Sequence, residues 1–374
     1  MAQPIDPVAL ARDLIRCPSV TPARGEVFDL LQSALEPLGF TIHRWVMGEP
    51  PDGPTENLVA IRGEGSPHFG FAGHLDVVPA GEGWEGFEAS VDGGVLVGRG
   101  ANDMKSAVAA YVAALSRLGD SSGTLSLLIT GDEEGYSTYG TPRIIDWLNE
   151  HQIRPDMILI GEPTSVDRLG DTVKIGRRGS VNMWIEVPGV QGHVAYPHRT
   201  TNPIGPLARV IAALDALHLD DGTDQFPPSN LEFTGIDTPT HASNVIPGSA
   251  TAQLNIRFNN LQRGADLVKR VEEIAEREAP GAKVRARISG EAFLTPPGKL
   301  YEVVVQAIED ETGLKPDLST SGGTSDGRFL IQLCPVVDFG LPNATMHKVG
   351  ECAAVDDIHA LSRIYERILR KVLG

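Results

Sequence analysis

Short apolar strands alternate with helices over the first 160 residues, and this alternation limits the fold more than any other feature of the chain. The apolar and helical periodicities predict strands at 58–62, 69–74, 95–98, 124–130 and 157–160, with helices at 103–118 and 142–151. Such an order predicts an α/β fold with a mostly parallel sheet. Open sheets of this kind bind ligands at the carboxyl ends of their strands, so residues far apart in sequence converge there.

The pattern changes near residue 180. Six elements follow in the order strand, helix, strand, strand, helix, strand, at 181–187, 203–217, 230–235, 250–258, 265–278 and 283–289. This order is that of a ferredoxin-like (β-α-β-β-α-β) unit, and glycine- and proline-rich joints flank it. We therefore predict one domain from residues 1–179 and 293–374, with a second domain, 180–292, inserted into it.

Composition excludes several kinds of partner. The formal net charge of −17 argues against nucleic acid, because phosphate binding needs a basic face. No run approaches the roughly 20 apolar residues of a membrane span, and the first residues lack a basic, then apolar, leader. The three cysteines, Cys17, Cys334 and Cys352, are few and widely spaced, as in a reducing compartment. These features predict a cytoplasmic protein that binds neither membrane nor nucleic acid.

Two segments of the first domain offer possible metal ligands, and each also has a purely structural interpretation. His74 and Asp76 lie at the end of an apolar strand, and period-two alternation places both side chains on one side. This suits a carboxylate that orients a ligating imidazole, although a structural turn is the alternative. Asp103 ends a glycine-rich turn and opens a predicted helix, so it is either a ligand or a helix N-cap.

More acids follow two other strands. Glu133 and Glu134 come directly after the apolar strand 124–130, where carboxylates repel one another and lose solvation unless cations or a catalytic role compensate. A solvated acidic loop is the alternative. Glu162 follows the strand at 157–160, and a second histidine, His347, lies near the C-terminus. Imidazoles and carboxylates are ligands that zinc accepts, and so many acids favour two ions sharing one carboxylate, a kind of site that serves hydrolysis.

Together these segments resemble the M20 metallopeptidase family over essentially the whole chain, including the insert. The family marks are His74-Leu-Asp76, Gly100-Ala-Asn-Asp103-Met-Lys105, Gly131-Asp-Glu-Glu-Gly135 and Gly161-Glu-Pro163. Other segments are similar to the branch that hydrolyses N-succinyl-LL-2,6-diaminopimelate, namely Ile175–Ser180, Gly192–Pro197, Ser321–Asp326 and Asn343–Cys352. Leu75, Asn102, Ser106 and Gly350 depart from the family pattern, but none of these departures removes a ligand.

The resemblance implies a zinc-peptidase-like catalytic domain that holds two Zn²⁺ ions per subunit, with Co²⁺ able to substitute. One ion would be bound by His74 and Glu162 and the other by Glu134 and His347, with Asp103 bridging them. Glu133 would be the general base, and Asp76 would orient His74.

The resemblance also assigns the inserted domain to dimerisation and to the active site. His193 would stabilise the oxyanion from the neighbouring subunit of a homodimer. The carboxylates of a small dicarboxylate amide substrate would be bound by charged and amide side chains, with three further hydrogen-bonding partners: Arg178, Arg257 and Asn244, then Ser180, Thr324 and Asn343.

The implied reaction yields succinate and LL-2,6-diaminopimelate, a step in bacterial lysine and cell-wall precursor synthesis. The nearest alternatives are the acetylornithine deacetylase and dipeptidase branches of the family.

A binding protein without turnover is a further alternative, but Glu133 and all the ligands are present. A serine hydrolase is another, because Gly323-Thr-Ser325-Asp-Gly327 fits G-x-S-x-G with Asp338 and His347 following it. The polar segment at 317–323 is a poor match for the apolar strand that such a nucleophile needs.

Overall fold

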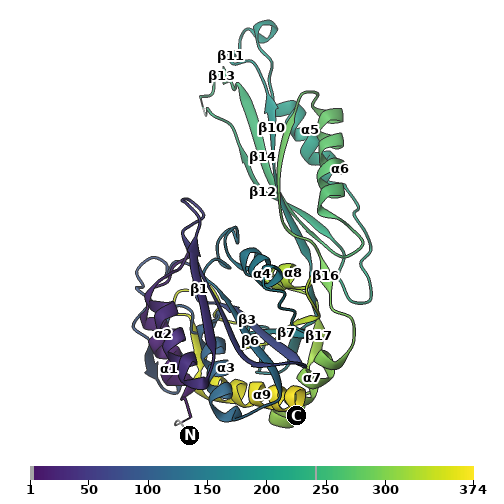
Figure 1. Ribbon diagram of the computed structural model, residues 1–374. Helices are drawn as coiled ribbons and strands as arrows, with labels where there is room; N and C mark the ends of the chain where they lie inside the picture. The colour runs from purple at the N-terminus through teal and green to yellow at the C-terminus, as the bar shows by residue number, and fades with distance from the viewer. Residues whose placement is uncertain (1–3, 241) are drawn as a thin grey trace. The chain divides into compact units, whose positions relative to one another are not determined.

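The computed structural model describes residues 4–240 and 242–374, and these form two compact units, described separately here (Figure 1). Unit 1 comprises Met1–Gly176, Thr295–Ser319 and Ser325–Gly374. Unit 2 comprises Arg177–Leu294 and Thr320–Thr324. The functional roles predicted for the two domains, catalysis for the first and dimerisation for the inserted one, stay predictions.

Unit 1 is built on an eight-stranded sheet in the order β1-β2-β6-β3-β7-β18-β8-β17. Its strands are β1 (Thr41–Met47), β2 (Thr55–Glu64), β3 (His68–His74), β6 (Gly123–Thr130), β7 (Met157–Ile160), β8 (Thr172–Lys174), β17 (Asp317–Ser319) and β18 (Val336–Asp338). The central strands β6, β3, β7 and β18 run parallel, as the strand–helix alternation predicted. The sheet is nevertheless mixed, because β1 and β2 are joined by a short connection and pair antiparallel, β2 pairs antiparallel with β6, and β8 with β18.

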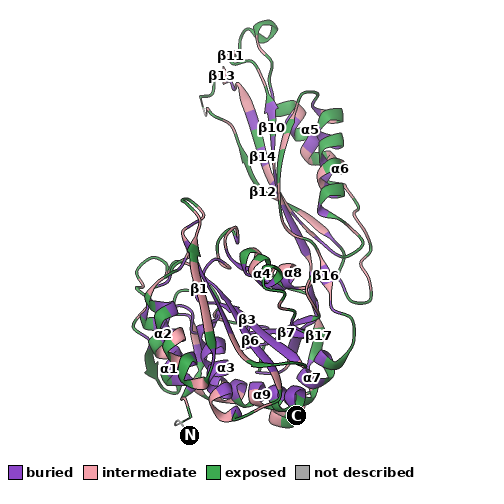
Figure 2. Cartoon of the chain, viewed as in Figure 1, coloured by how far each residue is buried: buried purple, intermediate pink, exposed green. Residues whose placement is uncertain are grey.

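Helices cover this sheet and bury its centre (Figure 2). They are α1 (Pro7–Arg16), α2 (Glu26–Leu35) with the 3₁₀ turn η1 (Glu36–Leu38), α3 (Lys105–Leu118), α4 (Thr141–Glu150), α7 (Lys299–Thr312), α8 (Gly327–Leu330) and α9 (Val355–Leu373). In α9, apolar residues recur at helical spacing and are buried, while acidic residues in the first turn and basic ones in the last complement the helix dipole. α3 is buried along nearly its whole length and packs against α1 and α9.

A small separate sheet corrects one expectation about the site. The predicted strand at 95–98 is β5 (Val95–Val97), which belongs not to the main sheet but to a three-stranded antiparallel sheet with β4 (Ser90–Asp92) and β19 (Cys352–Ala354). The residues after β5 therefore do not reach the site from a parallel strand. The pairing of β5 with β19 instead brings the loop after β5 beside the segment that precedes β19.

Unit 2 is a four-stranded antiparallel sheet in the order β12-β14-β10-β15, packed against two helices. Its elements are β10 (Gly179–Pro188), α5 (Ile204–Asp215), β12 (Asn230–Asp237), β14 (Ser249–Phe258), α6 (Gly264–Glu278) and β15 (Lys283–Gly290). They follow the predicted β-α-β-β-α-β order. Inward-facing residues of β10 and β14 alternate with outward-facing ones, and the buried set packs against α5 and α6.

Smaller elements complete the chain. They are β9 (Gly176–Arg177), β11 (Gly192–His193), the 3₁₀ turn η2 (Pro197–Arg199), β13 (Val245–Ile246) and β16 (Phe293–Leu294). β11 and β13 pair with each other in unit 2. Among the described residues, no helix combines the length and the apolar character that crossing a membrane requires.

Candidate metal centre

His74 is the last residue of β3 and is almost completely buried. Its Nδ1 lies 2.9 Å from the backbone oxygen of Asp76. A carbonyl oxygen only accepts hydrogen bonds, so this contact places the proton on Nδ1 and turns the Nε2 lone pair of a neutral ring towards the carboxylates beyond it. The ring is thus oriented as a metal ligand would be.

Asp76 contacts this histidine in a different way from the one predicted. Its carboxylate lies 3.6 Å from His74 Nδ1, farther than its own backbone oxygen. The same carboxylate accepts hydrogen bonds from the backbone N–H groups of Glu133, at 3.2 Å, and Glu134, at 2.9 Å. The reason is that Asp76 lies beyond the end of β3, where strand alternation no longer fixes the side chains. Asp76 therefore supports His74 through its carbonyl and the acidic loop through its carboxylate.

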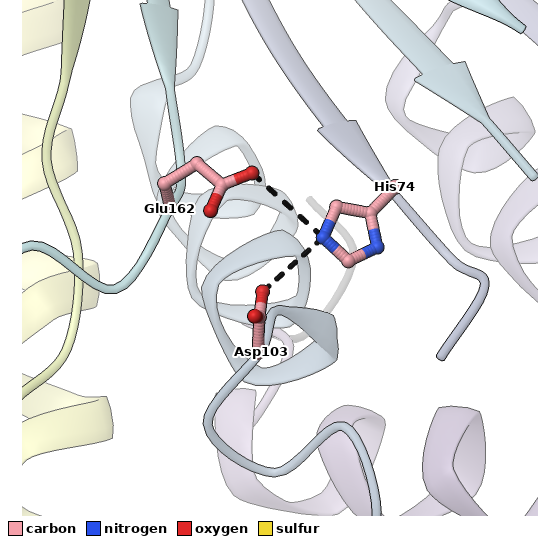
Figure 3. A group of neighbouring side chains, drawn as sticks. All are labelled: His74, Asp103 and Glu162. Atoms are coloured by element: carbon pink, nitrogen blue, oxygen red, sulfur yellow. Dashed lines mark hydrogen bonds and ion pairs between the residues drawn. The ribbon is translucent and has the colours of Figure 1, made fainter. Parts of the chain in front are cut away.

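The first group of possible ligands consists of His74, Asp103 and Glu162, all buried (Figure 3). His74 Nε2 lies 3.2 Å from Asp103 Oδ1 and 3.8 Å from Glu162 Oε1. Glu162 follows β7, the direct neighbour of β3 in the sheet, so the sheet itself brings these two side chains together. One imidazole and two carboxylates converging within ion-binding distance suit a divalent cation such as zinc.

A second group consists of Asp103, Glu134 and His347. His347 Nε2 lies 3.2 Å from Asp103 Oδ2 and 2.9 Å from Glu134 Oε1. Asp103 therefore belongs to both groups, with Oδ1 facing one imidazole and Oδ2 facing the other. A carboxylate arranged in this way can bridge two cations. The five predicted ligands thus come together in unit 1.

The acid–base properties of these side chains reflect carboxylates crowded around one buried imidazole, that of His74, and one exposed imidazole, that of His347. Burial raises the pKa of Asp103, but hydrogen bonds from His347 and His74 outweigh it and lower the pKa below its usual range. The pKa of His347 is raised to about 10 by its contacts with Asp103 and Glu134. Burial opposes the same effect at His74, yet Asp103 and Asp76 raise its pKa well above the usual value. The surrounding carboxylates therefore favour positive charge at this cluster of side chains.

Glu133 lies next to these ligands in sequence and is not a member of either group. Desolvation, followed by the nearby negative charge of Asp326, raises its pKa to about 8. A carboxyl group with a raised pKa is suited to accept a proton near neutral pH. Asp132, the first acid of the run, has a structural role instead, because its carboxylate accepts the backbone N–H groups of Ser137 and Tyr139.

The loop that carries Asp103 does not cap a helix. α3 begins at Lys105 and its cap residue, Met104, makes no side-chain cap hydrogen bond, so the N-cap alternative for Asp103 is wrong. The loop is instead bound by Glu351, which the sequence places in the motif Asn343–Cys352 without indicating this role. Its carboxylate accepts backbone N–H groups of the loop from about 250 positions away in the chain. No local pattern signals such a contact.

The predicted substrate-binding residues of unit 2 lie in two places within that unit. Arg178 donates a hydrogen bond to Asn230 at 2.9 Å, and Ser180 lies opposite Arg257 in the register of β10 and β14. His193 and Asn244 lie near each other, because His193 pairs with Val245 across β11 and β13. Both are exposed. Thr324 is half-buried in unit 2, and Asn343 is half-buried in unit 1, where its N–H donates to the Ser165 carbonyl.

The serine hydrolase alternative is wrong on geometry. Ser325 is fully buried and its Oγ donates a hydrogen bond to the carboxylate of Asp338 at 2.8 Å. His347 instead contacts Asp103 and Glu134. A nucleophilic serine needs an exposed hydroxyl that donates to an imidazole. Ser325 therefore joins the loop before α8 to β18 and is not a nucleophile.

Comparison with known proteins places the chain in a family. Residues 70–371 match the model of peptidase family M20/M25/M40. A protein of Rhizorhabdus wittichii named succinyl-diaminopimelate desuccinylase is 59% identical over 372 residues, covering 99% of each chain. One of the same name from Sphingopyxis alaskensis is 58% identical over 375 residues, covering 100% of each chain.

Solved structures show the same fold. An M20 family metallo-carboxypeptidase of Sulfolobus solfataricus has a TM-score of 0.81 at 16% identity, covering 100% of this chain and 99% of its own. The YXEP protein of Bacillus subtilis, described as a dinuclear metal binding peptidase from the M20 family, has a TM-score of 0.72 at 17% identity, covering 98% and 97%. These two likenesses concern the fold alone.

The chain belongs to peptidase family M20/M25/M40. The family resemblance and the α/β fold predicted from the sequence are both confirmed.

Proposed function

We propose that the chain hydrolyses N-succinyl-LL-2,6-diaminopimelate to succinate and LL-2,6-diaminopimelate, using two divalent cations. The shared name of its relatives, at 58–59% identity over nearly the full length, supports this substrate. The single observation that supports the two-cation reaction is the position of the Asp103 carboxylate. One of its oxygens faces the imidazole of His74 and the other faces that of His347.

The donor set of each group fits a zinc ion. In this proposal His74 and Glu162 bind one ion, Glu134 and His347 bind the other, and Asp103 binds both. Bound ions would polarise the amide carbonyl and make a water molecule acidic enough to be deprotonated near neutral pH. Because the ligands are imidazoles and carboxylates without sulfur, cobalt is expected to replace zinc.

Glu133 acts as the general base in this scheme. It accepts a proton from the attacking water at its carboxylate and returns that proton to the nitrogen of the leaving amine. Three features support the assignment: its place beside Glu134, its absence from both ligand groups, and the raised pKa of its carboxyl. Cations bound nearby would lower that pKa, which keeps the carboxylate ionised before the proton transfer.

The remaining residues bind substrate in this proposal. Guanidinium groups bind carboxylates through paired hydrogen bonds, which suits Arg178 and Arg257 to the succinyl and amino-acid carboxylates. Asn244, Ser180, Thr324 and Asn343 would contribute further hydrogen bonds. His193 would stabilise the oxyanion from the second subunit of a homodimer through unit 2.

Replacing the proposed base tests the mechanism. Glu133→Gln removes the proton acceptor and keeps the shape, so turnover of N-succinyl-LL-2,6-diaminopimelate should fall by roughly 100-fold or more. Zinc measured by plasma mass spectrometry should stay near two ions per chain, because Glu133 is not a ligand. Full activity in this variant would contradict the assignment of the base. Loss of zinc together with activity would instead make Glu133 part of the cage.

A further inference from the structure

Glu351 is a completely buried carboxylate close to the candidate metal centre. Its Oε1 accepts hydrogen bonds from three backbone N–H groups of one loop: Gly100 at 3.1 Å, Asn102 at 2.8 Å and Asp103 at 3.0 Å. The last of these is the backbone of the residue shared by both ligand groups. Glu351 therefore fixes the main chain of Asp103 rather than its carboxylate.

The other oxygen of Glu351 is bound by a buried arginine. Arg99 Nη1 donates to Glu351 Oε2 at 2.5 Å, and its Nη2 donates to the carbonyl oxygens of Pro79 and Ala80. The Arg99 guanidinium also lies over the ring of Trp84, 5.2 Å from its centroid. Arg99 thus compensates the charge of Glu351 and fixes its position in a dry environment, where an unpaired carboxylate would be costly.

Glu351 is also tied to the second imidazole. It lies four residues after His347, and its backbone oxygen accepts the N–H of Gly98 at 2.9 Å. Both residues lie in a segment whose two ends are joined by hydrogen bonds. The Thr345 hydroxyl donates to the Cys352 carbonyl at 2.7 Å and accepts the Cys352 N–H at 3.2 Å. One residue thus links the loop of Asp103 to the short segment that carries His347.

We propose that Glu351, held by Arg99, is a positioning residue that sets the spacing of Asp103 and His347. It acts on the second group of ligands, Asp103, Glu134 and His347, more than on the first. The reason is that His74 ends β3 and Glu162 follows the neighbouring strand β7, so the main sheet places both without this link. The inference rests on the two-metal function proposed above.

Glu351→Gln and Glu351→Ala separate the two interactions of the carboxylate. Gln keeps an oxygen for the loop N–H groups but presents an amide to Arg99, whereas Ala removes both partners. Loss of a residue that supports metal ligands typically weakens metal binding by roughly 10- to 100-fold. We expect a loss of this size for the more weakly bound ion in Ala, a smaller one in Gln, and partial recovery in Arg99→Met/Glu351→Gln, which leaves no unpaired buried charge.

The measurement is a titration of the metal-free full chain with Zn²⁺ by calorimetry, and with Co²⁺ by visible absorption. Hydrogen exchange of the amides of Gly100, Asn102 and Asp103 gives an independent readout that needs no metal. Glu56→Gln is the matched control, because Glu56 is a buried carboxylate bound by Arg44 and by the N–H of Gly25 and belongs to neither ligand group. It should lower stability without changing either metal affinity.

The outcomes separate this inference from the proposed function. Weakened binding of one ion, an altered Co²⁺ spectrum and faster exchange in the loop, all absent from the Glu56 control, would support it. A wild-type chain that binds two ions and hydrolyses the substrate, with both affinities unchanged in Glu351→Ala, would overturn the inference alone. A wild-type chain that binds no metal would overturn both. If Glu351→Ala does not fold, unchanged affinities in Glu351→Gln still contradict it.

Discussion

The contact between Asp76 and the acidic loop allows a sharp prediction. Asp76 is completely buried, and its two carboxylate oxygens accept the N–H groups of Glu133 and Glu134. Asp76→Asn keeps the shape and the backbone carbonyl that orients His74. It replaces one acceptor oxygen by an amide that, like the loop N–H it faces, can only donate. The variant therefore disturbs the placement of the base and of one ligand while leaving both residues in the chain.

The size of the effect follows from these two hydrogen bonds. A hydrogen bond to a charged group contributes about 1.5–3 kcal/mol, and one of the two is lost while the other becomes neutral. A loss of about 2 kcal/mol in transition-state stabilisation corresponds to a fall in kcat/KM of roughly 30-fold. We expect most of this in kcat, because the residues displaced serve the reaction rather than substrate capture.

The assay is steady-state hydrolysis of N-succinyl-LL-2,6-diaminopimelate by the zinc-loaded variant, with the zinc content measured in parallel. Asp132→Asn is a matched control, because Asp132 also accepts two backbone N–H groups, from Ser137 and Tyr139, neither of them proposed to act in catalysis. It should lower the melting temperature and keep kcat within a few-fold of wild type. Wild-type kcat in Asp76→Asn, or an equal loss in both variants, would show that the contact of Asp76 with the loop does not place the base.

Three further predictions concern the ligands, the rejected nucleophile and stability. Glu134→Gln should weaken the binding of one zinc ion and leave the other bound, as measured by zinc titration. Tight binding of both ions would show that Glu134 is not a metal ligand. Ser325→Ala should keep the rate of chelator-sensitive hydrolysis within about a few-fold, with a loss of stability from the broken bond to Asp338 of about 1 kcal/mol; abolished turnover at full zinc content would restore the serine mechanism. In unit 2, burial raises the pKa of Asp220, but hydrogen bonds from Ser229, Gln262 and Asn259 outweigh this and lower it to about 2. Because the folded pKa lies below the unfolded one, this group stabilises the fold above about pH 4 and ceases to do so as pH falls towards 2. Between pH 5 and pH 2, the free energy of unfolding measured with denaturant should therefore fall by about 1 kcal/mol less in Asp220→Asn than in the wild type, after solvent screening. An unchanged pH dependence would contradict this.

Strand order explains why some of the site could be predicted from the sequence. Glu162 follows an apolar strand and His74 ends another, so the parallel centre of the sheet brings them together whatever the details of the loops. Unit 2 was predictable for a similar reason, since its apolar periodicity and glycine-rich joints are local features.

Contacts between side chains and distant backbone could not be predicted in this way. Asp103 reaches the site from a loop after a separate small sheet. Its backbone N–H is bound by Glu351, which lies near the C-terminal end of the sequence. Asp76 uses its carbonyl for His74 and its carboxylate for Glu134, a division that depends on where β3 ends. Neither hydrophobic periodicity nor residue spacing carries information about such pairs.

In the proposed reaction, two cations held by the five ligands, with Glu133 as the base, remove a succinyl group from N-succinyl-LL-2,6-diaminopimelate. The most direct test is to compare kcat/KM for this compound, for N-acetylornithine and for a dipeptide, with the same zinc-loaded chain before and after chelation. We expect a kcat/KM for the succinyl compound at least roughly 100-fold above the others, a preference worth about 2.7 kcal/mol. This activity should be lost when the metal is removed and restored by zinc. Equal or greater activity on N-acetylornithine or the dipeptide, or activity that survives removal of the metal, would contradict it.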